Sequence, residues 1–149
     1  MSQIDPAEIP QGGFNRLLGL EYVDVSPDRV VARIEVDDRH LQPYGIVHGG
    51  VYASMVESVA SVGAAVWAHT QGIPGVVGLA NSTDFLQFHR EGPIVAAGTP
   101  VHRGKKLQLW QVEVTREMDG RVLARGQVRL LHLDDPKAIG GSEFLPGRP

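Results

Sequence analysis

The chain has 149 residues, of which 42% are hydrophobic and 21% are charged, a composition typical of one globular domain. It contains no cysteine, so disulfide scaffolds, thiolate catalysis and metal sites built on cysteine are excluded. The formal net charge is -3, which provides no general field to attract nucleic acid or an anionic membrane. We therefore expect neither as a partner.

The two ends of the chain differ in character from its middle. The N-terminal residues lack the charged and then apolar segments of a secretory signal, so we expect a cytoplasmic protein. Residues 136–149 are rich in glycine and proline and show no periodicity. We expect one domain over residues 1–135 and a disordered tail over residues 136–149.

The first regular segment is a hairpin within residues 19–37. Apolar residues alternate with polar ones after residue 29, which indicates a strand, and Pro27 and Asp28 mark the turn that precedes it. Polar and turn-forming residues then predict a loop over residues 38–47.

A long helix follows the glycine pair at 49 and 50 and runs to about residue 68, about 28 Å at 1.5 Å per residue. Its apolar run is interrupted by Ser54, Glu57, Ser58 and Ser61, unlike a membrane span of about 20 mostly apolar residues. Four strands are predicted after the helix, at about residues 76–88, 94–103, 107–116 and 122–133.

The order of these elements predicts the fold class. Two strands, one long helix and four strands with short connections form an α+β pattern, in which an antiparallel sheet covers the helix. A parallel sheet would need a helix between each later pair of strands.

The helix carries its polar residues at a spacing that points to chemistry. Ser54, Glu57, Ser58 and Ser61 are spaced i, i+3, i+4 and i+7, so they are expected on one narrow face. A carboxylate among valines suits a general base or a carboxylate nucleophile. The alternative is a polar stripe that touches solvent or a subunit interface.

The residues before the helix suggest an anion site. Glycines at 49 and 50 would let another molecule approach backbone N–H groups at the positive end of the helix dipole, which suits an oxyanion. Gln42, in the preceding loop, can add a side-chain amide donor. The alternative is a tight entry turn, since glycine pairs often form one.

The run HLQPYGIVHGGVYASMVESVAS resembles the signature of the hotdog-fold acyl-CoA thioesterases, of the phenylacetic-acid-degradation type and the Arthrobacter kind of 4-hydroxybenzoyl-CoA thioesterase. Together with the strand order, the resemblance covers residues 19–133. It implies a long central helix wrapped by an antiparallel sheet, active sites between subunits, and self-association as a dimer or tetramer.

The resemblance also implies roles for individual residues. The backbone N–H that polarises the thioester carbonyl corresponds to Gly49 or Gly50, and the nucleophile or general base to Glu57. Three further residues match the family's pattern. Gln42 matches an amide that holds the thioester, and Ser61 a hydroxyl that positions water. His48 matches a residue that in related enzymes more often supports the loop than takes the proton, so both roles stay open for it.

Substrate contacts are implied for two later segments. The strand after the helix faces the acyl pocket in the family, and there Asn81 and Thr83 share one face with Phe85, for which ordinary sheet packing is expected. The basic connection of His102, Arg103, Gly104, Lys105 and Lys106 corresponds to loops that contact the phosphates of coenzyme A. Gln87 stands where some relatives carry an arginine, so Arg90 or the basic loop would have to compensate.

The sequence thus predicts hydrolysis of an acyl-CoA, with an acyl carrier protein thioester as a second possible substrate. The six histidines form no HxH or HExxH pair, so no metal is expected, and no cofactor beyond the coenzyme A of the substrate. A hydratase of the same fold would need a different histidine loop. The alternative from another class is a non-catalytic acyl-CoA-binding hotdog protein, against which the combination of Glu57, Gln42, Gly49 and Ser61 argues.

Overall fold

A computed structural model of the chain describes residues 3–135 and 137, so the predicted tail lies outside the described residues except for Lys137. All predicted elements are present, and short helical segments at the N-terminus and in the loop before the long helix are added to them. The helical segments are η1 (Pro6–Glu8), α1 (Gly12–Leu18), η2 (Asp38–His40) and α2 (Gly49–Thr70). The strands are β1 (Glu21–Val25), β2 (Val30–Val36), β3 (Gly75–Phe85), β4 (Gly92–Arg103), β5 (Leu107–Arg116) and β6 (Val122–Leu133).

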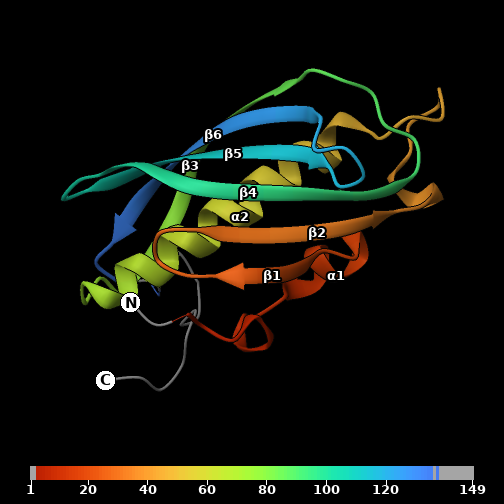
Figure 1. The fold of residues 1–149 in the computed structure, drawn as a ribbon. Helices are drawn as coiled ribbons and strands as arrows, with labels where there is room; N and C mark the ends of the chain where they lie inside the picture. The colour runs from red at the N-terminus through yellow and green to blue at the C-terminus, as the bar shows by residue number, and fades with distance from the viewer. Residues whose placement is uncertain (1–2, 136, 138–149) are drawn as a thin grey trace.

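The strands form one antiparallel sheet in the order β1-β2-β4-β5-β6-β3, and α2 lies against one face of it (Figure 1). This confirms the predicted α+β fold class. β3, the strand that follows α2 in the chain, pairs only with β6 and therefore forms one edge of the sheet. β1 forms the other edge.

The β1–β2 and β5–β6 turns have the chemistry that their residues favour. In the β1–β2 turn, the Ser26 hydroxyl accepts from the backbone N–H groups of Asp28 and Arg29, at 3.3 and 3.0 Å. In the β5–β6 turn, Gly120 adopts a positive φ of 71° and donates its N–H to Arg116.

The long helix α2 forms the centre of the core. Its own buried valines, alanines and one methionine lie around most of its circumference. By length and composition, α2 would be long and apolar enough to cross a membrane, but 67% of that stretch is buried inside the fold. Two glycines allow close packing on the sheet: a Cβ at Gly98 would overlap Val59, and a Cβ at Gly63 would overlap the Trp110 ring. The apolar character of α2 is therefore accounted for by the sheet that it packs on.

The largest difference from an expected boundary is at the end of β3. β3 ends at Phe85, not at residue 88. Leu86 and Gln87 both donate to the carbonyl of Leu123, so the chain leaves the ladder there, and His89 then accepts from the backbone N–H of Val47 at 2.8 Å. The segment after β3 is thus held against the loop that leads into α2.

The short helix α1 was not predicted, because its sequence has no buried face. Phe14 and Leu17 are 62% and 73% exposed, and seven residues are too few for a helix that is stable by itself. Tertiary hydrogen bonds hold α1 instead: Asn15 accepts from the Ser58 hydroxyl at 2.9 Å, and the buried His40 ring bonds the Leu18 carbonyl at 2.7 Å.

Two buried tyrosines lead to opposite stability predictions. The Tyr22 hydroxyl lies 3.4 Å from both its partners, the Asn15 amide and the Ser58 carbonyl, whereas the buried Tyr52 hydroxyl has no partner among the described residues. We expect Tyr22→Phe to lower the free energy of unfolding by about 1 kcal/mol and Tyr52→Phe to be neutral or stabilising. Chemical denaturation of both variants at pH 8 is the measurement, and equal losses would contradict the assignment.

The same tyrosines predict instability at high pH. Burial raises the pKa of Tyr22 and of Tyr52 to about 12 from 10.0, against the opposing effects of hydrogen bonds to Tyr22 and of the Arg116 charge near Tyr52. Between pH 10 and pH 12 the two tyrosines stay protonated in the folded state but lose their protons in the unfolded state. Their contribution to the free energy of unfolding is therefore fully present below pH 10 and falls as the pH rises toward 12. Denaturation at pH 8, 10 and 11 should show this fall, with a smaller slope in both Phe variants.

Candidate functional site

The start of α2 presents a backbone N–H, that of Gly49, without a partner among the described residues. His48 is the N-cap, and its Nδ1 accepts from the N–H of Gly50 at 2.8 Å. Within the described part of the chain, the N–H of Gly49 has no such partner. Of the two glycines expected at an oxyanion site, Gly49 is therefore the one with an available donor, at the positive end of the helix dipole. His48 therefore caps this end of the helix, and a catalytic role for it stays a prediction.

The loop before α2 holds Gln42 in a tight turn. Its backbone N–H donates to Ile46 at 2.8 Å, and its carbonyl accepts from Gly45 at 2.8 Å. The side-chain oxygen of Gln42 accepts from the backbone N–H of Tyr44. The amide end that remains is the NH₂ group, which makes no hydrogen bond to another described residue and is a donor, as an oxyanion site requires.

The carboxylate of Glu57 lies between α2 and β3. Its Oε2 accepts from Nδ2 of Asn81 at 3.2 Å. Its Oε1 lies against Gly78, where a Cβ would overlap it. Glu57 is half-buried, so this carboxylate is positioned by the strand and still has an open side, as a base or nucleophile needs.

The predicted polar stripe on α2 does not act as a unit. Glu57 faces β3, whereas the Ser58 hydroxyl donates to Asn15 on α1, across the helix. The Ser54 hydroxyl donates back to the Gly50 carbonyl at 2.6 Å. Ser61 is half-buried and forms no hydrogen bond to another described residue, so its hydroxyl is free for water. Residues at i, i+3, i+4 and i+7 span a sector of the helix surface that is wide enough to contact two neighbouring elements. Here β3 contacts one side of that sector and α1 contacts the other.

Two residues near the site were not among the predicted ones. The Phe85 ring, 57% exposed, lies so close to Gly49 that a Cβ there would overlap it, and its centroid is 6.0 Å from that of Tyr52. Phe85 therefore packs over the start of α2. This contact with the helix is additional to the sheet packing that was expected of Phe85. Gly78 was also missed, although a single glycine inside a strand is a recognised sign of a bulge or a close approach.

The predicted face of β3 is confirmed. Asn81 donates to the Ala53 carbonyl of α2 at 2.9 Å, and the Thr83 hydroxyl donates to Oδ1 of Asn81 at 2.7 Å. Both side chains therefore point to the helix, beside Glu57. Contact of Asn81 and Thr83 with a substrate stays a prediction.

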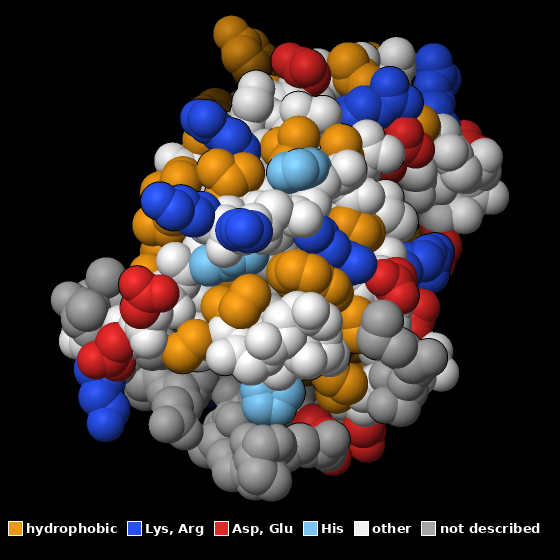
Figure 2. All heavy atoms as spheres, turned by 90° about the vertical axis from the view of Figure 1, so that its left-hand side faces the viewer, with side chains coloured by type: hydrophobic (Ala, Val, Ile, Leu, Met, Phe, Trp, Pro, Cys, Tyr) orange, Lys and Arg blue, Asp and Glu red, His pale blue; other side chains and the backbone are white. Residues whose placement is uncertain are grey.

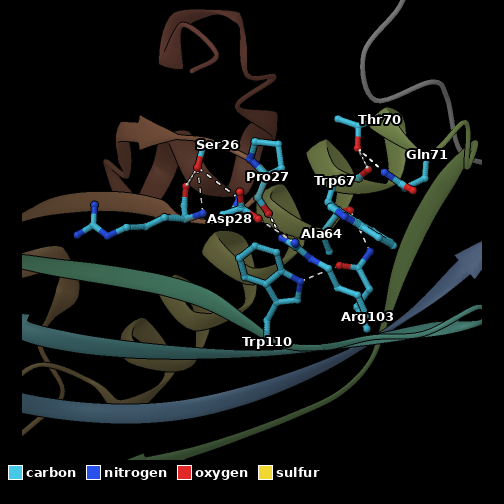
Figure 3. Close-up of polar contacts among 11 residues, drawn as sticks. Ser26, Pro27, Asp28, Ala64, Trp67, Thr70, Gln71, Arg103 and Trp110 are labelled. Carbon is cyan, nitrogen blue, oxygen red and sulfur yellow. Dashed lines mark hydrogen bonds and ion pairs between the residues drawn. The ribbon is translucent and has the colours of Figure 1, made fainter. Parts of the chain in front are cut away.

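The predicted basic loop divides into an inward and an outward part. Arg103 is packed within the fold, with its guanidinium 5.1 Å from the Trp67 ring centroid and 5.5 Å from that of Trp110, and it pairs with Asp28 at 2.8 Å (Figure 3). It also donates to the Pro27 carbonyl, and its side chain is 18% exposed. These contacts join the β4–β5 connection to the β1–β2 turn.

Lys105 and Lys106 form the outward part of that loop. Both are exposed and pair with no carboxylate among the described residues. Gly104 closes the turn between them and β4 by donating to Leu107 at 2.9 Å. Figure 2 looks onto this end of the molecule and shows lysine and arginine side chains gathered across its middle. Phosphate binding by this loop stays a prediction, with Lys105 and Lys106 as the available cations.

No group of three or more histidine, aspartate or glutamate side chains comes together as a metal site in residues 3–135 and 137. The ring nitrogens of His40 and His132 form hydrogen bonds within the fold. His40 bonds Asp37 and Leu18, and His132 bonds Gln108 at 3.2 Å and Lys105 at 3.0 Å.

Comparison with known proteins gives one consistent result. Residues 44–123 match the family model of the Thioesterase superfamily. A Mycobacterium tuberculosis protein with a provisional name as an esterase is 44% identical over 122 residues, which cover 81% of this chain and 86% of that protein. Its solved structure is similar with a TM-score of 0.79, at 43% identity, over 82% of this chain and 97% of that one.

Two further relatives carry more specific names. A 1,4-dihydroxy-2-naphthoyl-CoA hydrolase of Listeria monocytogenes is 33% identical over 107 residues, covering 72% of this chain and 85% of that protein. The solved structure of a Haemophilus influenzae thioesterase is 27% identical, with a TM-score of 0.76 over 82% of this chain and 83% of that one.

Proposed function

Since the chain belongs to the Thioesterase superfamily and has relatives that are named thioester hydrolases, we propose that it hydrolyses an acyl-CoA thioester to the free acid and coenzyme A. The observation that carries the proposal is the half-buried Glu57 carboxylate on α2, which β3 holds through the hydrogen bond from Asn81 to one of its oxygens. A protein that only bound acyl-CoA would have no use for a carboxylate in this position.

The proposed chemistry stabilises negative charge on the thioester oxygen. The N–H of Gly49 and the NH₂ of Gln42 donate to the oxyanion as the carbonyl carbon becomes tetrahedral. In one route, Glu57 takes a proton from water, the water oxygen bonds to the carbonyl carbon, the C–S bond breaks, and Glu57 returns the proton to the leaving thiolate. In the other, a Glu57 oxygen bonds to the carbonyl carbon and the thiolate leaves, and water then hydrolyses the mixed anhydride.

The distance along α2 supports a site that two chains share. Gly49 and Glu57 are eight residues apart, about 12 Å of helix, whereas reacting atoms must lie about 3–3.5 Å apart. One thioester cannot reach the donor and the carboxylate of the same helix together. We therefore propose that Glu57 of one chain works with Gly49 and Gln42 of a second copy.

The edge strand β3 supports this pairing. It presents 11 residues whose outer edge has no neighbouring strand within the described chain, and Leu79 on it is 55% exposed. The other edge, β1, is partly covered, because Ile4 pairs with Val25. A long exposed edge strand is a site for pairing with another chain.

We expect a mass of at least twice 16.1 kDa in solution. Leu79→Lys should reduce both the mass and the turnover, because it places a charge at the pairing edge. Val23→Lys is a matched control, since Val23 is 57% exposed at the opposite edge. Light scattering after size-exclusion chromatography measures the mass. A monomeric wild type, or equal effects of the two lysines, would contradict pairing through β3.

The relatives guide the choice of substrates. Since a relative is named for an aryl-CoA substrate, we propose to test aryl-CoA thioesters beside short, medium and long acyl-CoAs and an acyl carrier protein thioester. Release of free thiol from the wild type would establish the activity and the acyl class. Binding of coenzyme A without turnover of any substrate would favour the non-catalytic acyl-CoA-binding alternative. No cofactor enters the proposal, and a cytoplasmic location stays a prediction.

A further inference from the structure

The strand beside Glu57 contains one extra residue. Gly78 pairs with Leu130 and Ala80 with Arg129, so Leu79 is a bulge in β3. In a regular strand, residues three apart point to opposite faces. Because of the bulge, Gly78 and Asn81 both face α2, and each meets one oxygen of the Glu57 carboxylate.

Both amide hydrogens of Asn81 are engaged, and its amide oxygen accepts one hydrogen bond. One donor bond of Nδ2 goes to Glu57 Oε2 at 3.2 Å and the other to the Ala53 carbonyl at 2.9 Å. The amide oxygen accepts from the Thr83 hydroxyl at 2.7 Å. The Ala53 carbonyl is an acceptor only, so Nδ2 must point to α2, and the Thr83 hydroxyl supports that orientation from the other side.

The two carboxylate oxygens of Glu57 thus have different surroundings. Oε2 accepts a hydrogen bond from an amide that is itself fixed on both sides, whereas Oε1 lies over a glycine that contributes no side chain. A carboxylate held through one oxygen keeps its rotamer, and its other oxygen is presented in one direction. Such orientation contributes a large part of the rate acceleration, because a displacement of about 1 Å can lower the rate by about a hundredfold.

We propose that Asn81, oriented by Thr83, is a positioning residue that holds Glu57 through Oε2 and leaves Oε1 as the reacting oxygen, with Gly78 in the bulge providing the room. This inference rests on the proposed thioesterase function. It replaces direct substrate binding as the main role of Asn81, because both donor hydrogens of its amide are already used.

Kinetics of four variants test this role. Asn81→Ala should lower kcat by about tenfold to a hundredfold with little change in KM. It should also move the acid limb of the kcat/KM profile to higher pH, because the charged carboxylate loses a hydrogen bond. Thr83→Val should act in the same direction and Thr83→Ser should retain activity. Ser82→Ala, between them on the opposite face of β3, is the control and should match the wild type.

A measurement independent of turnover keeps the two proposals separable. The carboxyl carbon of Glu57, labelled with ¹³C and assigned with Glu57→Gln, is titrated by NMR in the wild type and in Asn81→Ala. A midpoint at higher pH in Asn81→Ala supports the positioning role, even if the wild type hydrolyses no thioester and the proposed function fails. An unchanged midpoint, or a rise in KM alone, would overturn it.

Discussion

Glu57→Ala is expected to lower kcat/KM for the best acyl-CoA substrate by about a hundredfold or more, in line with the 10² to 10⁴ that a general base contributes. The carboxylate is the only acidic group that α2 carries, and β3 holds it beside the helix through Asn81. No neighbouring acid along the helix can replace it. The measurement is thiol release from the substrate panel at matched folding and matched oligomeric state.

Two further variants sharpen this result. Glu57→Gln keeps the shape and the hydrogen-bonding reach of the side chain but not its basicity, so it should lose nearly as much activity as Glu57→Ala. A mixed dimer of Glu57→Ala with Gln42→Ala should regain activity if each site takes its carboxylate from one chain and its amide from the other. Retention of more than a tenth of wild-type activity in both Glu57 variants would remove this residue from the mechanism.

Gly63→Ala is expected to destabilise the fold by about 1–3 kcal/mol, the usual cost of overpacking a core. A Cβ at this position would overlap the ring of Trp110. The ring is fully buried and cannot move aside, because its N–H donates to Gln108 at 2.8 Å and Gln108 in turn donates to the Ala64 carbonyl at 3.1 Å. This loss should outweigh the gain of about 1 kcal/mol that alanine brings to a helix interior.

Urea denaturation measures this effect, and the chain offers a matched control. Gly13→Ala makes the same change in α1, where a Cβ would meet no atom within 4 Å, so it should be neutral or stabilising. In a Trp110→Phe background, the cost of Gly63→Ala should shrink, because the smaller ring leaves room for the methyl group. Equal effects of the two alanines would show that the Trp110 contact does not decide the stability of the helix–sheet interface.

The fold was largely predictable because its signals are local. Alternation, turn residues and the long apolar helix placed six strands and α2 within a few residues of their observed bounds. The longest element that was not predicted, α1, has exposed Phe14 and Leu17 and depends on hydrogen bonds to Ser58 and Arg39, residues far along the chain. A segment held by distant partners carries no periodic signal of its own.

By itself, the sequence determined the α+β class and the face of β3 that carries Asn81 and Thr83, and it singled out Glu57 on a buried helix as a candidate base or nucleophile. Only the tertiary structure decided how these groups are arranged. It engaged the N–H of Gly50 with His48 and left that of Gly49 open, turned Arg103 inward between two tryptophans, and put Gly78 opposite Glu57 through a bulge. Spacing along a chain determines which residues share an element's face, but hydrogen bonds and packing between elements determine which of their groups remain free.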